Sequence, residues 1–448
     1  MLSLKIMSNV LNSIASFLEK FMSPIAGKVA GNKHLQILAA SFMSILPLIM
    51  VGSFALIIAN PFMDYTTMQT TDMFYGFFKA WADFSAGFGK HLSYLFNVTL
   101  GAQGFWLSVA IAYTTAKRRN LHMLNSIIVV VVSFLVVNGE LIDWNWSTAY
   151  FGGTGLFSAI LVSFVAIDLY TVMSEKKLGY IKFPDSVPEV LSSSISTLVP
   201  ISLIFIIMCV VRAVFGDLLG TPFPTLIMSI GSQLNMAVDS IFGISLASTL
   251  SQIAWWFGIH SSAILSVVTP SLEANMLSNI NAYAAGVPLS ELPTIVNSTF
   301  YYTYVAIGGG GATFGLVLLM LKSKSEQIRA IGKLSIVPAF FGINEPVLFG
   351  LPVVLNPMFL IPFLLSHVVN IIICFYAMSL NLVNKVVMSL SAQTPIGLSH
   401  VLGNLDFRSL ILLVVIIVVD VVLYYPFFKI FEKEKVEEEQ QLANTANN

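Results

Sequence analysis

Long apolar runs dominate the sequence and restrict what the chain can fold into. Between Lys333 and Lys385 there are 51 residues with a single formal charge, Glu345. Over the whole chain, hydrophobic residues make up 56% and charged residues 10%, whereas soluble domains average about 25% charged residues. The 448 residues leave room for about ten spanning helices of roughly 20 residues each. We therefore predict an all-α polytopic membrane protein and exclude a nucleic-acid binder.

The apolar runs predict about ten transmembrane helices plus two re-entrant or partly unwound stretches. The stretch 223–246 is the most interrupted crossing, because it contains Gln233, Asn235 and Asp239. Residues 334–354 and 385–408 are too interrupted for clean crossings and are predicted to be re-entrant or partly unwound. The crossings are predicted to begin near residues 35, 95, 122, 153, 192, 223, 250, 300, 355 and 409.

The distribution of basic residues predicts the orientation in the membrane. Most of the 22 lysines and arginines fall in segments that are cytoplasmic if the N-terminus is inside, whereas the loop 271–299 contains none. By the positive-inside rule, both termini are predicted to be cytoplasmic. Residues 1–34 are expected to form an amphipathic segment on the membrane face. Residues 431–448 are expected to form a solvated cytoplasmic tail.

Glu345 is the first candidate site residue. A carboxylate in such apolar surroundings costs about 3 kcal/mol on insertion scales, so it needs a partner or a task. The five prolines around it argue against one uninterrupted helix, and a lone acid on a broken, buried segment is typical of a substrate site. Asn344 beside it offers both donors and acceptors for a hydroxyl-rich ligand. The structural alternative is a carboxyl that caps a half-helix or pairs with a basic residue.

A second candidate site combines aromatic and polar residues. Trp255 and Trp256 are followed closely by His260 and Ser261. Sugar C–H faces pack on aromatic rings while sugar hydroxyls take polar partners, so this mixture suits a sugar. The alternatives are that the tryptophans anchor the helix at the membrane interface and that the histidine is a core residue.

A glycine run, Gly308 to Gly311, is the third candidate. Gly311 and Gly315 form a small-xxx-small pair, which indicates close helix packing. The run could also let backbone approach a ligand or act as a hinge. The sequence has no P-loop, metal cluster or Ser/His/Asp arrangement, so we expect no metal, no cofactor and no self-contained enzyme. Cys209 and Cys374 lie in apolar runs and are expected to be buried hydrophobes.

Six stretches spread along the chain form a recognisable set. They are Tyr113-Thr-Thr-Ala-Lys-Arg, Ile181-Lys-Phe-Pro-Asp-Ser-Val-Pro188, Trp256-Phe-Gly-Ile-His260, Gly308-Gly-Gly-Gly-Ala-Thr313, Asn344-Glu-Pro through Asn356-Pro, and Tyr425-Pro-Phe-Phe-Lys429. Together they resemble the membrane subunit, enzyme IIC, of the bacterial sugar phosphotransferase system, in the lactose/cellobiose/diacetylchitobiose family, and they occur in family order over roughly residues 5–430.

The resemblance implies a homodimer in the bacterial plasma membrane, with residues 35–222 supplying most of the dimer contact and residues 223–430 holding the sugar. It implies that His260, Asn344 and Glu345 contact the sugar. It also implies a separate IIB protein that phosphorylates the sugar from a phosphocysteine. The chain departs from the family in the residues after His260 and in the segment 390–396, which lacks a tryptophan.

On this basis the expected function is uptake of an oligosaccharide, a disaccharide of the β-glucoside or cellobiose class, and its presentation to IIB. Glu345 is expected to orient the acceptor hydroxyl and take its proton, with His260 as its hydrogen-bond partner. Trp255, Trp256 and Ser261 complete the expected sugar site. One alternative is a proton-coupled secondary sugar transporter that uses Glu345 and His260 as a relay. The other alternative is a non-transporting membrane sensor.

Overall fold

The structure is a computed structural model, and it describes residues 32–61, 65–142, 144–181, 195–257 and 261–446. The described chain divides into two compact units, Lys33–Asn235 and Met236 onward. The division falls near the end of α9 (Phe223–Val238), whereas the expected boundary lies at 222–223. The predicted N-terminal amphipathic segment lies almost entirely outside the described residues.

The first unit is helical apart from one short antiparallel hairpin. In that hairpin Glu140 pairs with Ser147 and Ile142 pairs with Asn145. The elements are α2 (Lys33–Ala59), η1 (Tyr65–Thr67), α3 (Tyr75–Val98), η2 (Leu100–Ala102), α4 (Gln103–Arg119), α5 (Met123–Asn138), β1 (Glu140–Ile142), β2 (Asn145–Ser147), η3 (Gly153–Gly155), α6 (Leu156–Glu175), α8 (Leu198–Ala213), η4 (Val214–Leu218) and α9 (Phe223–Val238).

Helices α4, α5, α6 and α8 share one apolar core. An ion pair also connects three helices of this unit, because the Asp168 carboxylate on α6 accepts a 2.7 Å hydrogen bond from Arg119 on α4. His34 at the start of α2 places its Nε2 2.7 Å from the same carboxylate. The core comprises Ala112, Val129, Val130, Val137, Val162, Ala166, Ile167, Tyr170, Ile204 and Met208.

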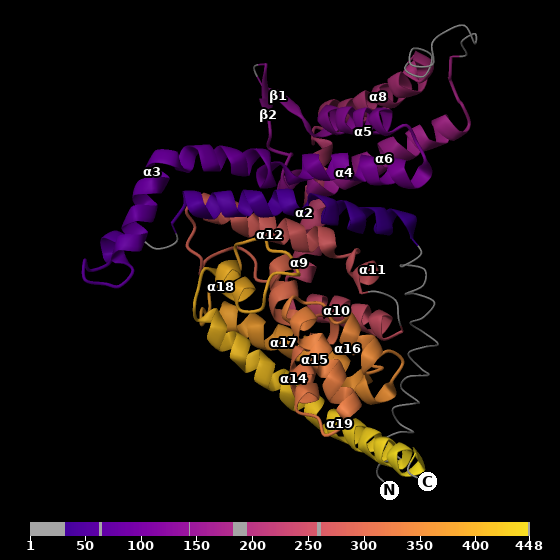
Figure 1. Ribbon diagram of the computed structural model, residues 1–448. Coiled ribbons are helices and arrows are strands. Elements are labelled where there is room, and N and C mark those ends of the chain that lie inside the picture. The colour runs from indigo at the N-terminus through magenta and orange to yellow at the C-terminus, as the bar shows by residue number, and fades with distance from the viewer. Residues whose placement is uncertain (1–31, 62–64, 143, 182–194, 258–260, 447–448) are drawn as a thin grey trace. The chain divides into compact units, whose positions relative to one another are not determined.

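The second unit is also helical, and many of its helices are short or broken. Within it, α14 packs against α15 and α19, and α17 packs against α10 and α19 (Figure 1). The elements are α10 (Ile241–Trp256), α11 (Ser262–Leu265), α12 (Thr269–Ala284), α13 (Ser298–Phe300), η5 (Tyr301–Val305), η6 (Gly310–Ala312), α14 (Phe314–Leu321), α15 (Glu326–Phe340), α16 (Glu345–Gly350), α17 (Pro357–Ser379), α18 (Leu398–Asn404) and α19 (Ser409–Ala446).

The predicted crossing at 223–246 is not straight. Helices α9 and α10 meet at an angle of 81°. Asp239 occupies the break, where its Oδ1 accepts hydrogen bonds from the backbone N–H groups of Ile295 at 2.9 Å and Val296 at 2.6 Å. Ser240 caps the following helix by accepting a 2.9 Å bond from Gly243 N–H. Of the three polar residues that interrupt the run, Asp239 therefore marks a real break, whereas Gln233 and Asn235 lie within α9.

The proline-rich segment after α15 is broken, as its sequence predicts. Helix α16 has only six residues, and Pro346 stands in its first turn. Asn356 caps α17 by accepting a 3.0 Å bond from Met358 N–H, and Pro357 occupies the first helical position. Proline is tolerated there because its missing N–H would have no helical partner.

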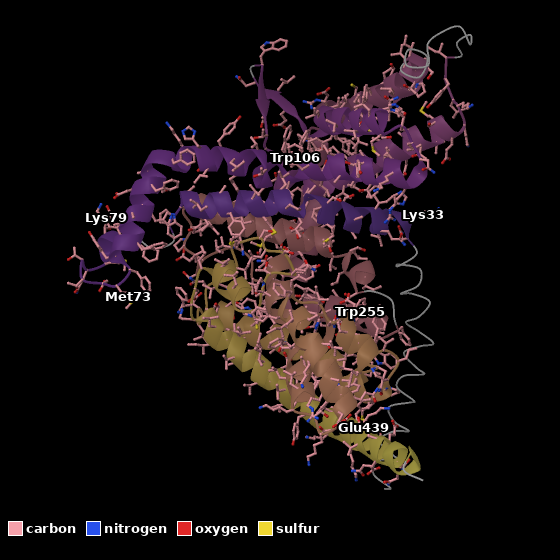
Figure 2. The ribbon with its side chains drawn as sticks, viewed as in Figure 1. Lys33, Met73, Lys79, Trp106, Trp255 and Glu439 are labelled. Carbon is pink, nitrogen blue, oxygen red and sulfur yellow. The ribbon has the colours of Figure 1, made fainter. Side chains whose placement is uncertain are left out.

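The C-terminal segment that is expected to form a solvated tail is helical as far as Ala446, and most of its charged side chains are exposed. Helix α19 continues to Ala446, and its acidic side chains bind the start of α15 (Glu439 is labelled in Figure 2). Glu439 accepts hydrogen bonds from Ser325 Oγ at 2.7 Å and from Gln327 N–H at 3.0 Å. Glu432 accepts a 2.7 Å bond from Lys324 N–H. The unsatisfied N–H groups at a helix start favour a carboxylate partner, so these contacts hold the end of α19 against the start of α15.

Six helices in the described parts of the chain are long and apolar enough to cross a membrane. The number rises to eight if each of two bent pairs, α9 with α10 and the helical stretch Ser298–Ala312 with α14, is one span. The protein is therefore a multi-pass membrane protein. The number of ten crossings with two re-entrant hairpins stays a prediction.

Candidate functional site

A sharp glycine turn before α14 forms the centre of the candidate site. Gly308, Gly309 and Gly311 all have positive φ angles, of 73°, 102° and 73°. A side chain is strained in this region, so glycine is the residue that fits. The turn is also closely packed, because a Cβ on Gly311 would lie 2.0 Å from a ring carbon of Phe363.

Asn344 is fixed onto this turn. Its Nδ2 donates a 2.7 Å hydrogen bond to the Gly310 carbonyl, and its side chain is buried. The contact depends on glycine, because a Cβ on Gly309 would lie 2.6 Å from Asn344 Cγ. The structure thus brings together two of the sequence-predicted motifs, which are more than 30 residues apart in the chain.

Glu345 has a different environment from its neighbour. The apolar run around Glu345 suggests a buried carboxylate, but the structure leaves Glu345 exposed as the first residue of α16. A helix N-terminus also favours a carboxylate, so this position is compatible with a charged residue.

Trp255 borders the same turn from α10 (labelled in Figure 2). A Cβ on Gly310 would lie 3.1 Å from Trp255 Cδ1 and 3.0 Å from Gln252 Oε1, one turn earlier on the helix. Both side chains are buried. The aromatic candidate and the glycine candidate are therefore in contact, together with a glutamine that the sequence analysis did not identify.

Trp256 has a structural role in the same unit. Its Nε1 donates a 3.1 Å hydrogen bond to the Asn356 carbonyl, and its own carbonyl accepts a 3.0 Å bond from Leu355 N–H. These bonds fasten the end of α10 to the segment before α17. Ser261 is half-buried, and its carbonyl accepts a 3.3 Å bond from Ser251 Oγ. His260 lies outside the described residues, so its predicted pairing with Glu345 stays a prediction.

The site offers hydrogen-bonding groups beside an aromatic ring. The amide oxygen of Asn344 is not used in its bond to Gly310, and Glu345 presents an exposed carboxylate. Trp255, near the end of α10, lies beside the glycine turn that Asn344 contacts. Such a set suits a ligand with several hydroxyl groups. Within the described residues, no group of three or more His, Cys, Asp or Glu side chains could hold a metal ion. Cys374 is buried as expected, whereas Cys209 on α8 is exposed, contrary to the expectation.

Two buried polar pairs in this unit were missed by sequence reasoning. Asn370 Nδ2 on α17 donates a 3.1 Å bond to Asp420 Oδ2 on α19. His367 Nδ1 lies 2.8 Å from Ser248 Oγ on α10. A signal for the first pair was present, because Asp420 interrupts an apolar run as Glu345 does. The sequence contains no pattern that would indicate the pair of His367 and Ser248.

Comparison with known proteins assigns the chain to a family. A family model described as phosphotransferase system, EIIC matches residues 39–366. The lichenan permease IIC component of Bacillus subtilis (strain 168) is 30% identical, with 96% of each chain covered. The cellobiose-specific EIIC component of Geobacillus stearothermophilus is 30% identical, over 94% of this chain and 95% of that one.

A solved structure also matches the fold. The crystal structure of the transporter ChbC, the IIC component from the N,N'-diacetylchitobiose-specific phosphotransferase system, has a TM-score of 0.84 and 29% identity. The match covers 95% of this chain and 99% of that chain. The apolar helices and these matches together show a multi-pass membrane protein of the sugar-permease class. More specifically, the chain belongs to the EIIC family of the phosphotransferase system.

Proposed function

We propose that this permease takes up a disaccharide of the cellobiose-like class and presents it for phosphorylation by a separate IIB protein. The observation that carries the proposal is the Asn344–Gly310 hydrogen bond of 2.7 Å, which places the Asn-Glu motif on the glycine turn beside Trp255. The sugar specificities in the names of the relatives, cellobiose and diacetylchitobiose, support a disaccharide.

Each side chain has a distinct task in this proposal. Asn344 uses its remaining amide hydrogen and its oxygen to bind sugar hydroxyls, because one hydrogen is committed to Gly310. Trp255 supplies the aromatic face. Glu345 orients the acceptor hydroxyl and takes its proton, with His260 as the proposed neighbour. Phosphoryl transfer depends mainly on positioning the acceptor hydroxyl and on stabilising charge.

The membrane arrangement belongs to the same proposal. We place both termini in the cytoplasm, on the side of the lysine- and arginine-rich segments. The first half, residues 35–222, forms the contact of a homodimer, and the second half, residues 223–430, holds the sugar. Ten crossings and two re-entrant hairpins complete this arrangement. Two compact units in the structure support a division of labour between the halves.

The test compares two glutamate variants. Glu345→Gln should keep sugar binding and lose phosphorylation by phosphorylated IIB. The matched control is Glu326→Gln, which changes another exposed glutamate at the first position of a helix, α15. Full phosphotransfer by the Glu345 variant would refute the base role. Equal loss in the control would mean that the effect is not specific to the site.

Uptake assays distinguish the proposal from its alternatives. Membrane vesicles holding the wild-type protein are given cellobiose, lactose or diacetylchitobiose, with and without phosphorylated IIB. The proposal expects phosphorylated sugar inside, dependent on IIB. Free sugar that accumulates with a proton gradient would instead support a secondary transporter, and binding without uptake would support a sensor.

A further inference from the structure

A buried carboxyl group lies between two of the long helices in the second unit. Asp420 of α19 is completely buried, and so is its partner Asn370 of α17. Their single hydrogen bond joins Asn370 Nδ2 to Asp420 Oδ2. The other oxygen of each side chain, Oδ1 in both residues, accepts no hydrogen bond from any part of the chain that the structure describes.

The surroundings of this pair offer little compensation for a negative charge. A Cβ on Gly315 would lie 2.9 Å from Asp420 Cβ, so the backbone of α14 covers the pair closely. The titratable groups near Asp420 are the Cys374 thiol and the Tyr424 hydroxyl, both uncharged at neutral pH, and among the described residues no basic side chain forms an ion pair with it. An ionised carboxylate without a counter-charge costs several kcal/mol in such a place.

A single proton would satisfy both unpartnered oxygens. A protonated carboxyl is a donor and an acceptor, as is a carboxamide, so the two groups can form a pair with two hydrogen bonds. In that pair Asp420 Oδ1 carries the hydrogen and Asn370 Oδ1 accepts it. The existing 3.1 Å bond from Asn370 Nδ2 is the other half.

The pair is one helical turn away from the bonds that hold the glycine turn. Ser366, four residues before Asn370, donates a 2.7 Å bond to the Gly311 carbonyl. Tyr424, four residues after Asp420, donates a 2.6 Å bond to the same oxygen. Residues four apart lie on one face of a helix, so the spacing of α17 and α19 sets both contacts at once. The neighbouring Gly310 carbonyl is the acceptor for Asn344.

We propose that Asp420 is a proton-carrying positioning residue that, with Asn370, holds α17 and α19 at the spacing required by the glycine turn and so places Asn344 for the sugar. The inference rests on the proposed function for its link to sugar binding. The pairing of a neutral Asp420 with the amide of Asn370 is a property of the protein without ligand.

The experiment uses variants at both positions in the full-length protein, purified in detergent. Asp420→Asn keeps a donor and an acceptor and should bind sugar as the wild type does. Asp420→Leu removes both and should weaken binding roughly three- to tenfold, the worth of one or two hydrogen bonds. The exchange Asn370→Asp with Asp420→Asn restores an acid–amide pair and should recover affinity. Val418→Leu, on the exposed face of α19, is the control.

A spectroscopic measurement keeps the test informative if Asp420→Leu fails to fold. Infrared spectra at neutral pH should contain the C=O band of a protonated carboxylic acid in the wild type and lose it in Asp420→Asn. Absence of that band in the wild type would overturn the inference, and so would loss of sugar affinity in Asp420→Asn equal to that in Asp420→Leu. Failure of the wild type to bind any sugar would instead contradict the proposed function, and the infrared result would stand by itself.

Discussion

Replacing Gly311 by alanine tests whether the glycine turn is held by its packing. Its positive φ of 73° costs a residue with a Cβ about 1–2 kcal/mol. The new methyl group would also lie 2.0 Å from Phe363 Cδ2 and 2.2 Å from Cε2, inside the ring's contact distance. Overpacking a buried site costs about 1–3 kcal/mol. The sum predicts that Gly311→Ala lowers the free energy of unfolding by about 2–5 kcal/mol.

A second glycine separates backbone strain from the clash. Gly286 has a φ of 87°, and a Cβ there would meet nothing within 4 Å. Gly286→Ala should therefore lose only about 1–2 kcal/mol. Thermal unfolding of both variants in the same detergent, followed by circular dichroism, gives the comparison. Equal shifts in apparent melting temperature would refute the packing argument.

A double variant tests the partner directly. Phe363→Leu shortens the ring that the new methyl group meets, so Gly311→Ala should destabilise the Phe363→Leu background less than the wild type. The difference between the two costs measures the clash itself. Purely additive effects would mean that the ring moves away freely and that Phe363 does not confine the turn.

Three further predictions concern residues around the site. Burial raises the pKa of Asp406, but hydrogen bonds from the Arg408 side chain and from backbone N–H groups outweigh burial, so this pKa lies below the usual 3.8. The ionised Asp406 carboxylate should therefore stabilise the fold fully above pH 3.8, and this contribution should be lost as the pH falls through the lowered pKa. Asp406→Asn should remove this part of an acid-unfolding curve. Glu439→Gln should weaken the cap of α15 by about 1 kcal/mol, measured as increased amide exchange at the start of that helix. Asn344→Asp places an acceptor against the Gly310 carbonyl, so it should cost about 1–3 kcal/mol in stability and weaken sugar binding in a calorimetric titration, whereas unchanged binding would argue against the anchoring role.

The sequence was sufficient for the class of fold because membrane insertion depends on composition and run length. The interruptions also predicted real features, since Asp239 marks a bend and two prolines, Pro346 and Pro357, stand at the starts of α16 and α17. The exposure of Glu345 could not be predicted. Burial depends on which way a break turns the chain, and nothing in the residues 341–344 specifies that direction.

The contacts between the charged end of α19 and α15 were missed for a related reason. A run rich in Glu, Lys and Gln has no apolar face that demands a partner, so composition favours a solvated tail. Its partners are the backbone N–H groups at the start of α15, and these groups carry no sequence signal. The same holds for the glycine turn, where backbone carbonyls of Gly310 and Gly311 accept bonds from three distant side chains.

In the proposed function, Asn344 anchors the Asn-Glu motif and Glu345 carries its charge. Asn344 spends one amide hydrogen on the Gly310 carbonyl and is buried, so its position follows the glycine turn. Glu345, the next residue, begins a helix and is exposed, so its carboxylate is available to a ligand while its backbone is fixed by its neighbour. A charge that must meet a sugar hydroxyl and a phosphoryl donor has to be accessible, yet held in place. The anchored Asn344 holds the neighbouring Glu345 in place without burying its carboxylate. An exposed Glu345 therefore fits the proposed chemistry better than the buried carboxylate that the sequence suggested.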